Sequence, residues 1–187
     1  MINTITLIRH SKVDRYPHLT SDKWPLSDEG KRLAINLTIA IPRLQTIFSS
    51  PQVKAFETAE IIAQNVSTDI ILRDGFTSVL GEGTGEIPNY SQIVEGFLTG
   101  KTDVINPGGE TMEQVRERVS REIDCLESEY PGLEDIGIVT HGLVLAIFLA
   151  SLYGKEPIQM HREIGMLDFT VIDWKSQTVL VPFGWVK

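Results

Sequence analysis

The chain is poor in cysteine, in long apolar runs and in positive charge, and each shortage excludes a class of protein. Its single cysteine, Cys125, rules out a disulfide framework and is expected to be a buried structural thiol. No apolar stretch is long enough to span a bilayer, and the first ten residues, MINTITLIRH, lack the basic start and long apolar middle of a signal peptide. We therefore expect a cytosolic protein.

Basic residues are outnumbered. Seventeen lysines and arginines stand against 25 aspartates and glutamates, for a net charge of -8. This balance argues against binding to nucleic acid and to an anionic membrane surface. It is compatible with a small anionic substrate, because a local cationic pocket can lie within an acidic protein.

Several catalytic signatures are also missing. Ser49 and Ser50 do not lie in a Gly-x-Ser-x-Gly elbow, and no glycine-rich nucleotide loop of the Walker type is present. The histidines show no pair at the spacing of a metal chelate; they are His10, His18, His141 and His161. We therefore predict no metal and no cofactor.

What the chain does contain is a recurring pattern of short apolar runs that end on polar residues. Thr4–Ile8 is followed by Arg9 and His10, Thr46–Phe48 by two serines, and Ile136–Val139 by Thr140 and His141. Short apolar runs that alternate with helical stretches are typical of an α/β sheet, which binds ligands beyond the carboxyl ends of its strands. We expect the two histidines and the arginine to share one crevice.

The remaining pattern fits one domain over residues 1–187, whose 42% hydrophobic content is enough for a sizeable core. Residues 73–109 hold many glycines, and we expect a lid-like insertion at about 74–107. The other predicted elements are a strand at Asp69–Leu72, a helix at Tyr90–Leu98, an amphipathic helix at Glu110–Glu129, a buried helix at Leu143–Tyr153, and a hairpin of Leu167–Trp174 with Thr178–Phe183.

Two further helices have predicted starts. Ser27 opens the first, whose apolar positions are Leu33, Leu37 and Ile41, and Pro42 ends it. The second is expected to start with Ser50 as its cap and Pro51 at its first position. Its inward residues are Ala55, Ala59, Ile62 and Ala63.

Four motifs occur in an order and spacing that resemble one family. They are Leu7-Ile8-Arg9-His10, Ser49-Ser50-Pro51 with Lys54 and Thr58-Ala59-Glu60, Gly108-Gly109-Glu110-Thr111, and Val139-Thr140-His141-Gly142. Together they resemble the histidine phosphatase superfamily, also called the phosphoglycerate mutase-like family. This resemblance implies an α/β/α sandwich of three layers with a mostly parallel central sheet.

The resemblance also implies a mechanism. His10 matches the family nucleophile and would attack phosphorus with a neutral ring nitrogen while a backbone acceptor fixes the tautomer. Arg9 would hold two phosphoryl oxygens, and His141, matching the second family histidine, would stabilise the developing charge. Ser11, Lys54 and Gly142 are the further expected phosphate-binding residues, Gly142 because it opens a helix.

The proton donor for the leaving group is expected in the segment after the third strand. Glu82, between two glycines, is the preferred candidate, Asp74 matches the first acidic position of the family, and Glu86 is a third candidate. All three are also compatible with ordinary solvated loop acids.

Two residues depart from the family pattern. Ser11 stands where the family usually has glycine, and Lys54 where it usually has arginine, which loses the bidentate fork. The leading expectation is a metal-independent phosphatase that acts on a small phosphorylated substrate through a phosphohistidine. The alternative is a catalytically weak member that binds phosphorylated ligands or a protein partner. The sequence leaves the physiological substrate and the oligomeric state open.

Overall fold

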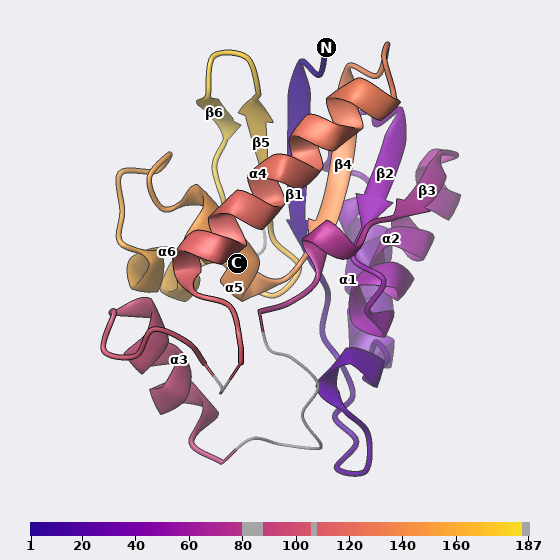
Figure 1. Cartoon of the computed structure of the whole chain (residues 1–187). Coiled ribbons are helices and arrows are strands. Elements are labelled where there is room, and N and C mark those ends of the chain that lie inside the picture. Colours follow the sequence, from indigo (N-terminus) through magenta and orange to yellow (C-terminus); the bar gives the residue numbers. More distant parts are fainter. Residues whose placement is uncertain (80–87, 106–107, 185–187) are drawn as a thin grey trace.

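A six-stranded mixed sheet forms the centre of the molecule in a computed structural model, which describes residues 1–79, 88–105 and 108–184 (Figure 1). The strand order is β3-β2-β4-β1-β5-β6. The strands are β1 (Thr4–Arg9), β2 (Thr46–Ser49), β3 (Asp69–Leu72), β4 (Asp135–Thr140), β5 (Phe169–Asp173) and β6 (Thr178–Val181).

The first four strands run parallel, which confirms the expected parallel core of the sheet. β4 lies between β1 and β2, and β3 pairs with the far side of β2. β5 pairs antiparallel with β1 and with β6, so the predicted hairpin is also present. The carboxyl ends of β1, β2 and β4 therefore lie side by side at one edge of the sheet.

Helices cover both faces of the sheet, as the α/β/α prediction requires. Figure 1 shows α4 and α5 on one face and α1 and α2 on the other. The helices are α1 (Asp28–Leu37), α2 (Val53–Val66), α3 (Tyr90–Leu98), α4 (Met112–Glu129), α5 (Gly142–Leu149) and α6 (Pro157–Glu163), with short 3-10 turns η1 (Ser21–Lys23) and η2 (Asp74–Phe76).

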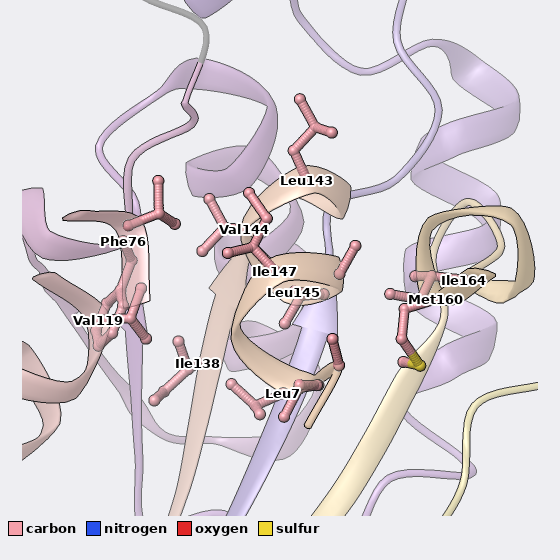
Figure 2. Packing of buried hydrophobic residues seen from close by; sticks show 14 of the residues in the cluster. Leu7, Phe76, Val119, Ile138, Leu143, Val144, Leu145, Ile147, Met160 and Ile164 are labelled. Carbon is pink, nitrogen blue, oxygen red and sulfur yellow. The ribbon is translucent and has the colours of Figure 1, made fainter. Parts of the chain in front are cut away.

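The larger of the two hydrophobic clusters surrounds α5, nearly all of whose side chains are buried. Figure 2 shows this helix with Phe76 and Val119 on one side and Met160 and Ile164 on the other. A helix that is apolar all round is stable in water only when other elements enclose it. This enclosure fixes the start of α5, where His141 and Gly142 lie.

The structure corrects the predicted start of α2. Its N-cap is Gln52, and no side chain caps it by a hydrogen bond. The Ser50 hydroxyl instead lies 2.9 Å from His141 Nε2, just beyond the carboxyl ends of the paired strands β2 and β4. A tertiary contact has therefore replaced the local capping role that the Ser-Pro pair suggested.

Other boundaries differ by a few residues. Ser27 caps α1 as predicted and accepts a hydrogen bond from the Gly30 amide, but the helix ends at Leu37, before Pro42. α5 ends at Leu149 although apolar residues continue to Tyr153, and α6 was not predicted. Cys125 is only partly buried. The starting and ending residues of α3 and β3 match the prediction.

The described part of the predicted insertion contains η2 and α3, and α3 packs against α6. Within the three described ranges, no helix has both the length and the apolar character needed to cross a membrane.

Gly30→Ala is expected to destabilise the fold by about 1–3 kcal/mol, because the new Cβ would lie 2.1 Å from the Lys12 carbonyl oxygen. That oxygen accepts the Ser27 amide and joins α1 to the loop after β1. Urea unfolding measures the loss. Gly96→Ala is the control, since its nearest neighbouring atom is 3.8 Å away, and it should leave stability unchanged or slightly raised. Equal stability of the two variants would contradict this packing.

Candidate active site

A cavity of about 290 Å³ opens beyond the carboxyl ends of β1 and β4, where the sequence predicted a shared crevice. It is lined by Arg9, His10, Val13, Arg15, Ser21, Trp24, Lys54, Ser78, Tyr90, His141, Gly142, Leu143, His161 and Met166. Five of the predicted site residues are therefore brought together from three separate parts of the chain. They are Arg9, His10, Lys54, His141 and Gly142.

His10 is buried and held in one orientation. Its Nδ1 lies 2.8 Å from the Ser11 carbonyl oxygen. Because a carbonyl only accepts hydrogen bonds, Nδ1 carries the proton and Nε2 keeps its lone pair. Burial, with the positive charge of Lys54 as a second cause, lowers the pKa of His10 to about 3. The imidazole is thus neutral near pH 7, as a nucleophile must be.

His141 faces His10 across the cavity, with their ring centroids 5.2 Å apart. Its Nε2 contacts the Ser50 hydroxyl, whereas Nδ1 is buried without a hydrogen-bond partner among the described residues. Burial, followed by the nearby His10, lowers the pKa of His141 well below its usual value. An unpartnered buried nitrogen is costly unless a ligand satisfies it.

Arg9 presents a second unsatisfied group. Its Nη1 donates to the carbonyl oxygens of Ile164 and Gly165, at 2.8 and 3.4 Å, which anchors the guanidinium at one end. Its Nε is buried without a partner within the described chain. A Cβ on Gly142 would lie 2.8 Å from this Nε, so glycine is what allows the guanidinium to lie against the start of α5.

Lys54 supplies positive charge from the first turn of α2. Its Nζ donates to the Ser21 carbonyl oxygen at 2.8 Å, and only 7% of the residue is exposed. Burial lowers the pKa of Lys54 to about 8, although nearby Asp22 acts in the opposite direction. The ammonium is therefore charged at neutral pH and loses its proton within reach of ordinary buffers.

Ser11 does not direct its hydroxyl into the cavity. The hydroxyl donates to the Gly30 carbonyl oxygen at 2.8 Å, and the Ser11 amide donates to Thr58 Oγ1. Thr58 in turn donates to the Lys54 carbonyl oxygen. Ser11 and Thr58 thus join the loop after β1 to α2, and Ser11 contributes to the site through the carbonyl that holds His10.

The acidic candidates are not brought into the cavity by the described structure. Asp74 is exposed at the start of η2 and does not line the cavity, because the turn directs Phe76 into the core and Ser78 toward the site. Hydrogen bonds from Arg118 to the Gly75 and Thr77 carbonyl oxygens hold this turn. Glu82 and Glu86 lie outside the described residues.

Several lining residues were not among the predicted site residues, chiefly Arg15, Trp24, Tyr90 and His161. The first two belong to the loop after β1. Trp24 lies near two cations: Arg15 Cζ is 5.8 Å and Lys54 Nζ 6.0 Å from the ring centroid. An aromatic residue in a loop between predicted site residues was the available signal.

Comparison with known proteins agrees with this geometry. A family model described as the histidine phosphatase superfamily (branch 1) matches residues 5–182. The chain belongs to the histidine phosphatase superfamily. It is also 31% identical over 134 residues to phosphoglycerate mutase-like protein 4 of Arabidopsis thaliana, a match that covers 64% of this chain and 56% of that relative. The match thus spans little more than half of the relative's length.

Solved structures share the superfamily fold. Phosphoserine phosphatase from Entamoeba histolytica superposes with a TM-score of 0.74 at 19% identity, covering 97% of this chain and 96% of that one. Bacillus stearothermophilus YhfR gives 0.73 at 22% identity, with 96% and 95% covered. A mycobacterial glucosyl-3-phosphoglycerate phosphatase gives 0.70 at 16%, with 97% and 96% covered.

The sequence predicts no metal site, and the positions of the side chains that could bind a metal are as follows. Among the described residues, no group of three or more histidine, cysteine, aspartate or glutamate side chains lies close enough together to hold a metal ion. The positive charge that lines the cavity comes from Arg9, Arg15 and Lys54.

Phosphate affinity is expected to fall as pH rises above about 8, where Lys54 loses its charge. Above this pH, the affinity for phosphate should fall by up to ~10-fold per pH unit, which is the limit when binding requires one proton. The fall ends at the pKa of Lys54 in the phosphate complex, which is higher than in the free protein. In Lys54→Arg this component should vanish, because guanidinium stays protonated. Calorimetric titration with inorganic phosphate from pH 6 to 10 measures it, and the ratio of wild type to variant cancels the ionisation of phosphate itself.

Lys54→Met provides a second comparison if the larger guanidinium disturbs the buried site. It should bind phosphate more weakly at pH 7 and show no step near pH 8. A step near pH 8 that persists in both variants would assign the titration to another group.

Proposed function

We propose that this protein is a metal-independent phosphatase that hydrolyses phosphomonoesters through a phosphohistidine on His10. The observation that carries the proposal is the pairing of a tautomer-fixed, neutral His10 with two buried nitrogens, Arg9 Nε and His141 Nδ1, that have no hydrogen-bond partner among the described residues. A phosphoryl group in this cavity would satisfy both nitrogens while lying next to the nucleophile.

In the first step, the lone pair of His10 Nε2 forms a bond to phosphorus as the bond to the ester oxygen breaks. The electron pair of that bond leaves with the alkoxide, which takes a proton from a carboxylic acid, for which Glu82 is the preferred candidate, to become the alcohol. In the second step, water attacks phosphorus and gives a proton back to this carboxylate, the P–N bond breaks with its electron pair returning to Nε2, and phosphate and neutral His10 are released. The Ser11 carbonyl stabilises the extra positive charge on the imidazole during both steps, since it accepts from Nδ1.

The other groups hold the phosphoryl oxygens. The Ser50 hydroxyl accepts from the Gln52 amide, so its own proton is available for His141 Nε2. His141 Nδ1 then carries a hydrogen directed to a phosphoryl oxygen. The start of α5 adds its free backbone amides and positive dipole, and Arg9 and Lys54 add charge.

The names of structural neighbours support a phosphomonoester substrate. One neighbour is a phosphoserine phosphatase and another a glucosyl-3-phosphoglycerate phosphatase, each under 25% identical to this chain. Both names describe hydrolysis of a phosphate ester on a superfamily fold. They support the reaction type, and the substrate of this chain is a separate question.

A second candidate is a family member that binds phosphorylated ligands with little turnover. Lys54 favours it, because a lysine orients phosphate less well than the arginine that is usual at this position. Asp74 favours it as well, because this candidate proton donor is exposed and lies outside the cavity. Tight phosphate binding by a folded protein that does not turn over esters would establish this function.

His10→Ala is expected to lower p-nitrophenyl phosphate hydrolysis by at least about 1,000-fold, because it removes the nucleophile. Turnover should persist with a chelator in the wild type. His18→Ala is the matched control, since His18 is exposed and does not line the cavity, and it should keep full activity. Mass spectrometry after an alkaline quench should find the phosphoryl group on the peptide containing His10. Unchanged activity in His10→Ala would overturn the mechanism.

Glu82→Gln tests the preferred proton donor, with Asp74→Asn as its control. If Glu82 protonates the leaving group, the variant should lose about 100-fold or more in kcat with an alkyl phosphate and much less with p-nitrophenyl phosphate, whose leaving group needs little protonation. Asp74→Asn should change neither rate. Steady-state kinetics with the two substrates gives the comparison, and the opposite pattern would assign the role to Asp74.

A further inference from the structure

The cavity has two chemically different parts. Its floor is formed by Arg9, His10, Lys54 and His141, which are charged or imidazole side chains, and the last three are at most 7% exposed. Its outer wall, defined here as Val13, Trp24, Tyr90 and Met166, is only partly buried and consists of apolar or aromatic side chains. The floor suits the phosphoryl group, so the leaving group is left to contact the outer wall and the other lining residues, among them Arg15, Ser78 and His161.

The outer wall is assembled from distant segments. Val13 and Trp24 come from the loop after β1, Tyr90 begins α3, and Met166 lies between α6 and β5. The Trp24 indole is anchored by its Nε1, which donates to the Tyr16 carbonyl oxygen at 3.1 Å. An anchored indole keeps its ring in place without a ligand, which reduces the entropy lost on binding.

Tyr90 connects the outer wall with the floor. The charges of Arg9 and Arg15 both act on its hydroxyl, and its pKa is nevertheless raised because burial outweighs them. Tyr90 therefore lines the same cavity as Arg9 and Arg15, close enough for both charges to act on its hydroxyl. Tyr90 is 37% exposed, so part of its aromatic surface is available to a ligand.

We propose that the leaving group recognised by this site is a compact alcohol that carries one aromatic ring. This inference rests on the proposed function. Trp24 and Tyr90 supply aromatic surface, for which ring stacking and edge contacts are favourable, and Val13 and Met166 supply apolar surface around it. The volume of about 290 Å³ lies just below the usual range for small-molecule sites, about 300–1,000 Å³, and suits a phosphate with a single ring.

The first measurement is binding of phosphonates, which cannot be hydrolysed and so report recognition without turnover. Benzylphosphonate is expected to bind about tenfold more tightly than propylphosphonate, the gain that one aromatic contact of this kind provides. Trp24→Leu and Tyr90→Ala should each reduce this preference by a larger factor than they reduce the affinity for inorganic phosphate. Leucine retains apolar volume in the loop, and Tyr90 is at an exposed helix start, so both variants should fold.

Tyr16→Ala is the matched control. Tyr16 is an exposed aromatic residue of the same loop whose ring makes an edge-to-face contact with His18 and does not line the cavity. The hydrogen bond from Trp24 goes to its backbone carbonyl, which the substitution keeps. The benzyl preference should be unchanged in this variant. If Tyr16→Ala lost as much of the benzyl preference as Trp24→Leu, the conformation of the whole loop, and not the Trp24 ring, would determine the preference.

Two results would overturn the inference. One is equal affinity for benzylphosphonate and propylphosphonate. The other is tighter binding of 2-amino-4-phosphonobutyrate, an isostere of phosphoserine, than of benzylphosphonate, which would mean that Arg15 binds a carboxylate of the ligand. Hydrolysis of benzyl phosphate and propyl phosphate tests the proposed function separately from this inference. The two esters release alcohols of similar basicity, so a difference between their rates reports recognition of the ring. A clear benzyl preference in binding without hydrolysis of either ester would refute the phosphatase activity and leave the ligand class intact.

Discussion

The pairing of β1 with β4 is the constraint on which the rest of the site depends. The two strands run parallel with Ile8 opposite Val139, and the His10 amide donates to the Thr140 carbonyl oxygen at 2.9 Å. A single hydrogen-bonding register thus places His10 and His141 at the same sheet edge. A slip of one residue would move the side chains of the slipped strand to the opposite faces of the sheet, which their packing into the two hydrophobic clusters opposes.

At this sheet edge the fold brings positively charged side chains together and buries them. Both effects act on the histidines and on Lys54. Burial keeps both histidines neutral and lowers the pKa of Lys54 to about 8. No carboxylate is among the described residues that line the cavity. An anion that enters therefore gains interactions that the empty site does not have, since buried donors without partners are unfavourable.

Prediction from sequence succeeded where a local pattern and a tertiary role coincide. α4 is the amphipathic helix that its periodicity predicted, and α3 has the predicted bounds. It failed at Ser50, which has the chemistry of a helix cap but contacts His141. These two residues are 91 positions apart in the chain, and no local pattern records such a partner.

The sequence by itself determined the alternation of strands and helices, the strand ends that carry Arg9 and His141, and the superfamily, because these depend on short-range patterns and on motif order. Only the tertiary structure decided that Ser11 supports His10 through its carbonyl, that Gly142 makes room for Arg9, and that Trp24 and Tyr90 share one wall. These relations join segments that are far apart along the chain. They follow from the packing of the sheet, the loop after β1 and α3, which is a property of the whole fold.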